Sequence, residues 1–220
     1  MQLDPIGWSV VLVGRWNPAI LSPAGIKKYV FRLPAEQQIQ VAVPLDGVSA
    51  YLITNPEETL IVHVEEGRLQ MDLPKCNFAS LMHGMQAGIN ALEALPVTPI
   101  SAVGLNLNFM TATVCQELVN ATDCAIDNTF ADQGYAIVGR STGRSVTFGE
   151  GQINIKVARQ GEQFHVNCNF HLSTQDPGKA IIWLQTSPDA VKAELEKIGK
   201  ILNVQLEEKK DDKLNQLPPG

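Results

Sequence analysis

A strict alternation of apolar and polar residues between positions 163 and 172 constrains the fold of this chain more than any other feature. Successive side chains of a β-strand point to opposite faces of a sheet, so this segment is predicted to be a strand with one apolar and one polar face. A helix, with about 3.6 residues per turn, would mix the two sets around its surface. The apolar and polar sets are, in order, Phe164, Val166, Cys168, Phe170 and Leu172, and Gln163, His165, Asn167, Asn169 and His171.

This strand is predicted to be the second arm of a long hairpin. Residues 152–157 alternate in the same way, and Arg159-Gln160-Gly161 forms the turn. An earlier hairpin is predicted between residues 60–64 and 68–73, with its turn at Glu65-Glu66-Gly67. Glycine in such a turn is expected to supply the positive φ that the loop needs.

The same order of elements is predicted on both sides of residues 95–99, where Pro96 and Pro99 forbid a continuous helix. Each half has a strand, a short helix, two strands, a hairpin and a long helix. In the first half the elements other than the hairpin are a strand at 8–16, a helix after Ser22-Pro23, strands at 39–43 and 50–54, and a helix at 78–92 capped by Asn77. In the second half they are a strand at 100–109, a helix at 113–120, strands at 135–139 and 145–148, and a helix from Ser187-Pro188.

We therefore predict an α+β fold in which internally duplicated strand–helix–antiparallel strands–helix units form one continuous curved antiparallel sheet with helices on one face. An unrelated α+β fold with the same order of elements is the alternative. The expected divisions are a first half at 1–95, a second half at 96–206 and a flexible tail at 207–220, of which residues 207–213 are all charged. An interaction tail is the alternative for this last segment.

This order of elements resembles the duplicated topology of the TATA-binding-protein-like fold over most of the chain. The resemblance implies two units that build one curved sheet with helices on its convex side. Members that bend DNA use apolar wedges and a basic saddle, and this sequence has neither. The resemblance therefore implies the shape of the fold and not the function.

A second resemblance is to uncharacterised, sporadically distributed prokaryotic proteins of similar length. In those proteins a mid-chain helix leads into a strand of the type Ile-x-x-x-Gly-Leu-x-x-Asn. The corresponding segment here begins at Ile100, has Gly104 and Leu105 at its centre and ends at Asn108. No chemistry is assigned to that family, so the resemblance implies none.

The polar positions of the strands are expected to share one face of the sheet, which we call the polar face. Asn is depleted in strands, so a face dense in amide and imidazole groups suits hydrogen bonding to a polar ligand or to a second polypeptide. An ordinary solvated face, or an edge strand at 163–172 that pairs with another subunit, are the alternatives. The candidate binding residues are Asn106, Asn108, Asn154, Lys156, His165, Asn167, Asn169 and His171.

No metal site, cofactor or catalytic residue is predicted. His165 and His171 share a face of their strand while Cys168 points to the other face, so the three cannot converge on one ion. Ser80 and His83 lie three residues apart on a helix, but no third group is placed to orient the imidazole. No C-x-x-C pair occurs, and buried free thiols are expected at Cys76, Cys115, Cys124 and Cys168.

Residues 139–144, with the sequence Gly-Arg-Ser-Thr-Gly-Arg, are predicted to form a β-turn. The segment is Gly-rich and basic like a phosphate-binding loop, but it lacks the Lys-Ser/Thr ending and the following helix. Arg140 and Arg144 lie among hydroxyl groups and glycine amides. They are therefore the best candidates for contact with an anion.

Charge and hydropathy narrow the classes of partner. The chain has 17 Lys and Arg residues against 23 Asp and Glu, and the net charge of −6 argues against a general nucleic-acid binder, although a local basic patch stays open. The N-terminus has no basic segment followed by an apolar run, and no apolar stretch approaches the roughly 20 residues that span a bilayer. We expect a cytoplasmic protein that does not enter a membrane.

We expect a non-enzymatic binding protein, self-associated as a homodimer, that uses the polar face to hold a protein partner or a polar small molecule. The alternative is an enzyme or nucleotide-handling protein with His165, His171 and Arg144 around a cleft between the halves, because histidine exchanges protons near neutral pH. A third possibility is nucleic-acid binding through a saddle-like sheet, which a strongly salt-dependent interaction with DNA or RNA would support.

Overall fold

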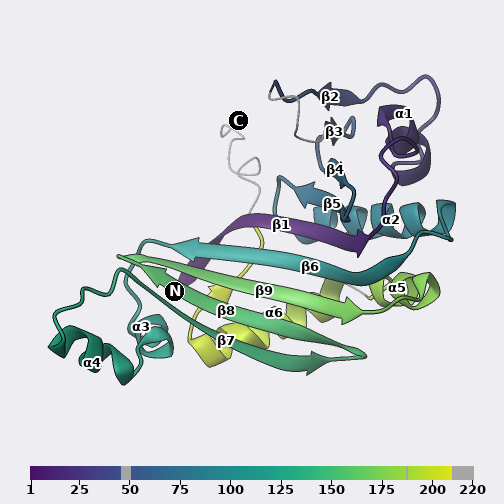
Figure 1. The fold of residues 1–220 in the computed structure, drawn as a ribbon. Helices are drawn as coiled ribbons and strands as arrows, with labels where there is room; N and C mark the ends of the chain where they lie inside the picture. Colours follow the sequence, from purple (N-terminus) through teal and green to yellow (C-terminus); the bar gives the residue numbers. More distant parts are fainter. Residues whose placement is uncertain (46–50, 187, 210–220) are drawn as a thin grey trace, which may run out of the picture.

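The computed structural model describes residues 1–45, 51–186 and 188–209, which form a layer of strands with helices behind it (Figure 1). The strands are β1 (Gln2–Gly14), β2 (Gln40–Ala42), β3 (Leu52–Thr54), β4 (Ile61–Glu65), β5 (Arg68–Leu73), β6 (Ile100–Thr111), β7 (Gly139–Phe148), β8 (Gly151–Gln160), β9 (Gln163–Ser173) and β10 (Gln205–Leu206). The helices are α1 (Pro23–Gly25), the π-helix η1 (Ile26–Val30), α2 (Phe78–Ala94), α3 (Gln116–Thr122), α4 (Ile126–Asp132), α5 (Pro177–Leu184) and α6 (Pro188–Leu202).

The strands join into one sheet with the order β2-β3-β4-β5-β1-β6-β9-β8-β7, and each of these neighbouring pairs is antiparallel. β1 and β6 pair at the centre along most of their length. Each half of the chain places its first strand at the centre and the second strand of its hairpin, β5 or β9, directly beside it. β10 is a short parallel neighbour of the start of β1. The predicted α+β class and antiparallel sheet are confirmed.

Helices α2, α5 and α6 lie on one side of the sheet, behind the strands in Figure 1, whereas α3 and α4 lie at one end of β6 and β7. α2 contacts β1 and β5, and α5 contacts α2 and β6. Glycine brings α2 close to its neighbours, because a Cβ atom on Gly88 would lie 3.2 Å from Cδ1 of both Leu12 and Leu184. The close packing offsets the cost of glycine inside a helix, which is about 0.5–1 kcal/mol relative to alanine.

Side-chain caps fix where the helices begin. Ser22 Oγ accepts a hydrogen bond from the amide of Gly25 at 3.4 Å, and Asn77 Oδ1 accepts one from Ser80 at 2.8 Å. Both caps agree with the sequence prediction, and each satisfies an amide that has no partner inside the helix. The predicted cap at Ser187 lies outside the described residues, although α6 begins at Pro188 as expected.

Apolar side chains of the strands meet in rows on the face that carries the helices. In one row Val10 lies opposite Leu105, Leu105 opposite Phe170, and Phe170 opposite Ile153. Each of these four residues is at most 1% exposed. Burial of a side chain of this size contributes about 1.5–3 kcal/mol. The alternation that predicted the strand at 163–172 therefore also determines which face the helices cover.

β7 is the largest departure from the predicted secondary structure. Residues 139–148 form one ten-residue strand, so the β-turn predicted at 139–144 is wrong, and of the strand predicted at 135–139 only Gly139 lies in a strand. All ten residues pair with β8 without a break, from Gly139 opposite Gln160 to Phe148 opposite Gly151. This pairing outweighs the weak strand propensity of the glycines in the segment. The chain turns instead at Gly149, which has a φ of +55°.

Further differences concern one hairpin turn and one helix face. Gly161 has a φ of +60°, as expected, but Gly67 does not adopt a left-handed φ. Met82, predicted on the buried face of α2, is 51% exposed. Gly84 and Gly88 are buried in α2 and belong to the side that meets the sheet, which turns Met82 toward solvent.

The remaining differences concern the ends of elements and helices without a predicted counterpart. β1 begins at Gln2 and shifts register between Pro5 and Gly7, whereas the strand was predicted from Trp8. α4 and α5 were not predicted. Residues 210–220 of the predicted tail lie outside the described residues, and within the described part Glu208 accepts a hydrogen bond from the amide of Phe78 at 2.8 Å.

Candidate functional site

A row of hydrogen-bonded side chains crosses five strands on the polar face, and we call it the first amide row. Its directly opposed members are Ser9, Asn106, Asn169, Asn154 and Ser145, from β1, β6, β9, β8 and β7. Asn106 Nδ2 donates to Ser9 Oγ at 3.4 Å, and Asn169 Nδ2 donates to Asn106 Oδ1 at 2.6 Å. Asn154 Nδ2 donates to Asn169 Oδ1 at 3.3 Å, and Ser145 Oγ donates to Asn154 Oδ1 at 2.7 Å. These bonds fix the orientation of the three carboxamides.

A second amide row lies two residues further along each strand. Asn167 Nδ2 donates to Asn108 Oδ1 at 2.7 Å, and Asn108 Nδ2 donates to the carbonyl oxygen of Gly7 at 2.7 Å. Lys156 lies opposite Asn167, and Gly143 lies opposite Lys156. Lys156 is exposed, so the row ends in a cation that is accessible to solvent.

The amide rows keep hydrogen-bonding capacity toward solvent. A carboxamide has two N–H donors and an oxygen with two lone pairs, so a bond to each neighbour leaves one donor and further acceptor capacity. The amide residues concerned are all partly exposed, and they are Asn106, Asn108, Asn154, Asn167 and Asn169. The polar face can therefore donate to and accept from the same neutral polar group.

The two rows border a shallow hollow, which we call the amide hollow. Its volume is about 500 Å³, and β7 forms one side of it. The volume falls within the range of about 300–1,000 Å³ that is typical of ligand sites, but the lining is dominated by amide, hydroxyl and basic groups. The residues that line it are Asn106, Ser141, Thr142, Gly143, Arg144, Ser145, Asn154, Ile155, Lys156, Asn167 and Asn169. The structure thus brings together five of the eight predicted binding residues, and Asn108 borders a second hollow of about 420 Å³ beside Ser9.

The two predicted histidines do not join the amide hollow. Six positions along β9 separate His165 from His171, which places them roughly 20 Å apart. His171 Nε2 lies 2.8 Å from Ser173 Oγ. His165 lines a separate hollow of about 310 Å³ that also contains Arg140.

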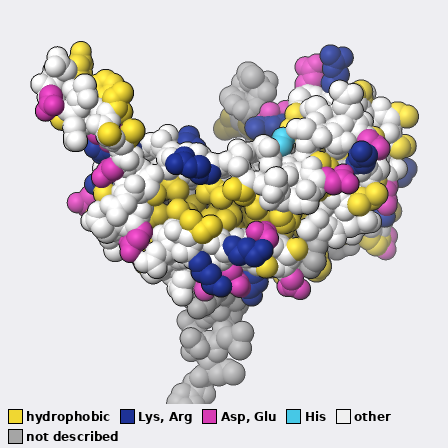
Figure 2. Space-filling view, turned by 90° about the horizontal axis from the view of Figure 1, so that it is seen from below, with side chains coloured by type: hydrophobic (Ala, Val, Ile, Leu, Met, Phe, Trp, Pro, Cys, Tyr) yellow, Lys and Arg dark blue, Asp and Glu magenta, His cyan; other side chains and the backbone are white. Residues whose placement is uncertain are grey.

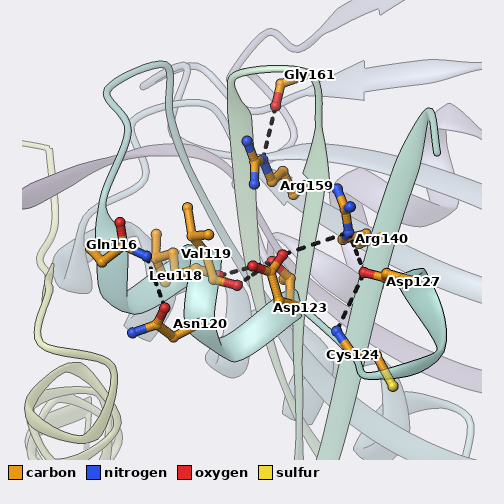
Figure 3. A network of polar contacts seen from close by, with 11 residues as sticks. Gln116, Leu118, Val119, Asn120, Asp123, Cys124, Asp127, Arg140, Arg159 and Gly161 are labelled. Atoms are coloured by element: carbon orange, nitrogen blue, oxygen red, sulfur yellow. Dashed lines mark hydrogen bonds and ion pairs between the residues drawn. The ribbon is translucent and has the colours of Figure 1, made fainter. Parts of the chain in front are cut away.

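Arg140 anchors the segment that precedes β7. We call residues 123–138 the arm, which contains α4 and has Asp123 and Asp127 near its start. Figure 3 shows the guanidinium group directed toward both carboxylates. Arg140 Nε lies 2.5 Å from Asp127 Oδ2 and 3.6 Å from Asp123 Oδ1. The hydrogen bond from Arg140 is the main reason that the pKa of Asp127 is lowered.

The prediction that Arg140 and Arg144 flank an anion-binding loop loses its geometric basis. The loop is part of β7, and two carboxylates already neutralise Arg140. Arg144 Nη1 donates to the carbonyl oxygen of Gly143 at 2.7 Å and to Thr142 Oγ1 at 3.0 Å. Of this pair, only Arg144 borders the amide hollow.

The residues of the predicted enzyme alternative are not brought together. Arg144 borders the amide hollow, which neither histidine lines, and His165 lines a different hollow. Within the described residues, no group of three or more His, Cys, Asp and Glu side chains is placed to hold a metal ion.

The first half of the chain continues the polar face with residues that the sequence analysis missed. Asp72 lies opposite Ser9, and its Oδ2 atom lies 2.6 Å from His63 Nε2. Gln70 Nε2 donates to Asp72 Oδ1 at 2.7 Å. Burial raises the pKa of Asp72, but the hydrogen bonds from His63 and Gln70 and the nearby charges of His63 and Arg68 together outweigh it, so the pKa is lowered. The signal for these positions is the alternation of residues 68–73, in which Gln70 and Asp72 lie between Leu69, Met71 and Leu73 and so fall on one face.

The cysteines are free, but they do not share one environment. Cys76, Cys115 and Cys168 are buried, as predicted, whereas Cys124 is exposed on the arm. Burial raises the pKa of the Cys168 thiol to about 12. Cys168 therefore behaves as a small apolar side chain of the core.

Comparisons with known proteins add little to this description. No protein-family model and no curated protein matches the sequence. Among solved structures, this chain is similar to the TBP of Methanococcus jannaschii. The match covers 92% of this chain and 97% of that chain, with 8% sequence identity and a TM-score of 0.28. This is a weak likeness at the level of the fold, without a shared motif. Within the described residues, none of the helices is long and apolar enough to cross a bilayer.

Proposed function

We propose that the protein is a non-enzymatic binding protein whose polar face holds a partner rich in amide and hydroxyl groups, either a polypeptide surface or a polar small molecule. The observation that carries the proposal is the pair of amide rows beside the amide hollow. Asn106, Asn154, Asn167 and Asn169 are oriented by hydrogen bonds before any partner arrives. Such preorganisation lowers the entropic cost of binding.

The chemistry of the rows favours a neutral polar partner. Carboxamides supply donors and acceptors side by side, which matches peptide groups, amides and hydroxyls. Among the ten residues of the two rows the only cation is Lys156, at the end of the second. Recognition of a phosphate backbone needs clustered Lys and Arg residues, so nucleic-acid binding has less support than binding of a neutral polar group.

The enzyme or nucleotide-handling alternative also has less support. Acid–base catalysis by two histidines requires both within hydrogen-bond reach of one substrate. His165 and His171 stand near opposite ends of β9, and Arg144 borders the amide hollow, which neither histidine lines. A single substrate of ordinary size would not touch all three.

The proposal is tested by native mass spectrometry of protein purified from cell extract. The variant Asn108→Leu with Asn167→Leu removes both ends of a 2.7 Å hydrogen bond together, which leaves neither amide unpaired and keeps the branching of the side chains at Cγ. The matched control is Asn128→Leu, on an exposed position of α4. We expect the wild type and the control to retain a polar molecule or polypeptide that the double variant loses. Equal retention by the double variant, or a wild type that retains nothing, would refute the proposal.

We also propose that the two halves of the sheet descend from a duplicated unit. The supporting observation is the matched order of strands, because the first strand of each half lies at the centre of the sheet beside the second strand of the hairpin of the same half. Expression of residues 96–209 alone tests the idea, since a duplicated unit is expected to retain cooperative unfolding. A chain that stays unfolded by circular dichroism would count against it.

A further inference from the structure

β7 forms one edge of the sheet and has a free backbone side. All ten residues pair with β8, and among the described residues no strand lies on the other side of β7. Seven of the ten residues from Gly139 to Phe148 are exposed and the others are partly exposed. An edge strand presents a row of unpaired N–H and C=O groups, which is a template for another strand.

The edge of β7 lacks most of the features that prevent pairing. Proteins protect edge strands with charged side chains, above all lysine, or with proline, bulges or short length. β7 has no proline or lysine, it is ten residues long, and its register with β8 contains no shift. Its two charged side chains have partners within the chain, because Arg140 is paired with carboxylates of the arm and Arg144 donates to its own strand. The residues of β7 on the polar face are Ser141, Gly143, Ser145 and Thr147, which are small enough for a neighbouring strand to approach.

An exposed apolar surface adjoins the same edge. Val146 is 44% exposed, and Phe148 and Ile155 are only partly buried. Figure 2, which views the molecule from the side where β7 lies in Figure 1, shows hydrophobic side chains gathered in a hollow at the middle of this face. A second sheet edge placed beside β7 would extend the apolar face and cover part of this surface.

We propose that two copies of this chain pair through β7 as antiparallel strands, with Ser145 of each copy opposite Ser145 of the other. Such a pair has two-fold symmetry, so the same surface serves on both sides. Residues that face each other across the axis have numbers that sum to 290, which sets Thr142 opposite Phe148 and Arg144 opposite Val146. The polar faces of both copies then lie on the same side of one continuous sheet.

The charges of this segment exclude two antiparallel registers. A pair centred on Arg144 would place this arginine opposite itself, and a pair centred on Thr142 would place Arg140 opposite Arg144. Like charges directly opposite each other destabilise a sheet. Centring on Ser145 avoids both contacts and brings Arg140 of each copy, which is also paired with two carboxylates of its own chain, opposite Glu150 of the other. Centring on Gly143 avoids both contacts as well, so the choice of Ser145 rests on the amide rows.

This pairing would also join the amide rows of the two copies. The first amide row ends at Ser145, which donates to Asn154 at 2.7 Å. With Ser145 at the two-fold axis, the row continues into the same row of the second copy. The inference is independent of what the polar face binds, because it rests on the edge, the register and the charges of β7.

The test uses the full chain and sedimentation velocity over a range of concentrations. We expect the wild type to sediment with the mass of two 24.0 kDa chains at micromolar concentration. Ser145→Lys and Ser145→Asp each place a charge opposite itself, so each is expected to raise the dissociation constant of the dimer about tenfold or more. A mixture of the two variants in equal amounts should recover dimers, because the opposed residues then carry opposite charges.

The controls are Val41→Lys and Val41→Asp, which place the same charges on the exposed strand β2 at the other edge of the sheet. We expect both controls to dimerise like the wild type, and circular dichroism to show the same fold for all variants. A monomeric wild type would overturn the proposal and favour an extended segment of another protein at this edge. Equal dimerisation of Ser145 and Val41 variants, or no recovery in the mixture, would also overturn it.

Discussion

The first amide row makes a quantitative prediction about stability. Replacement of Asn169 by alanine removes the bond it donates to Asn106 at 2.6 Å and the bond it accepts from Asn154 at 3.3 Å. A hydrogen bond of this kind contributes about 0.5–1.5 kcal/mol net, and the longer bond belongs at the lower end of that range. Because Asn169 is partly exposed, water replaces some of the lost contacts. We expect Asn169→Ala to lower the free energy of unfolding by about 1–2 kcal/mol.

Urea unfolding followed by circular dichroism measures this loss, and a thermal scan should show a midpoint lower by about 2–8 °C. A double-mutant cycle with Asn106→Ala isolates the shorter bond, for which we expect a coupling of about 0.5–1.5 kcal/mol. Asn128→Ala, on the exposed arm, is the control and should change stability by less than about 0.5 kcal/mol. A loss at Asn169 no larger than in the control, or strict additivity in the cycle, would refute the idea that the amide row stabilises the sheet.

Three further outcomes follow from the core, the cysteines and the polar face. Phe170→Ala should lower the free energy of unfolding by about 3–5 kcal/mol in a urea titration, because Phe170 is fully buried. A loss under about 1 kcal/mol would contradict its place in the core. Iodoacetamide should label Cys124 in the folded protein and leave Cys168 unlabelled, as measured by mass spectrometry, since Cys168 is buried and its pKa is raised to about 12. Rapid labelling of Cys168 would contradict the fold of β9. The pKa of Asp72 is lowered, so its ionised form stabilises the fold at neutral pH and this contribution disappears as the pH falls through the lowered pKa. The free energy of unfolding of Asp72→Asn should therefore be lower than that of the wild type at pH 7, and the difference between the two should be smaller near pH 3. A difference that grows on acidification would contradict a lowered pKa of Asp72.

Much of the fold could be predicted because its pattern is local. The alternation in β9 and the caps at Ser22 and Asn77 each depend on neighbours in the sequence. The same alternation placed the asparagines on one face, and the structure brings Asn106 and Asn169 into direct contact. A period of two residues therefore specified the chemistry of a surface as well as the position of a strand.

What the sequence did not show depends on contacts between distant segments. β7 is a strand because β8 pairs with it, although its own glycines and serines are typical of a turn. Arg140 meets Asp127 through the position of the arm, and no local pattern predicts that ion pair. Likewise β9, a candidate for an edge strand, lies between β6 and β8, because strand order is a property of the whole sheet.

The position of β1 has a consequence for synthesis of the chain on the ribosome. β1 is made before the other described strands, yet its antiparallel neighbour β6 ends at Thr111 and its parallel neighbour β10 comes at Gln205–Leu206. Gln2 lies opposite Gln205, and the amide of Gln205 donates to the carbonyl oxygen of Met1 at 2.7 Å. One edge of β1 therefore stays unpaired until β6 has emerged from the ribosome, and the start of β1 stays unpaired until β10 has emerged. A nascent chain that stalls before residue 205 would leave the start of β1 without its parallel neighbour. This exposed edge could pair with other chains, so we expect chaperones or proteases to act on such a stalled chain.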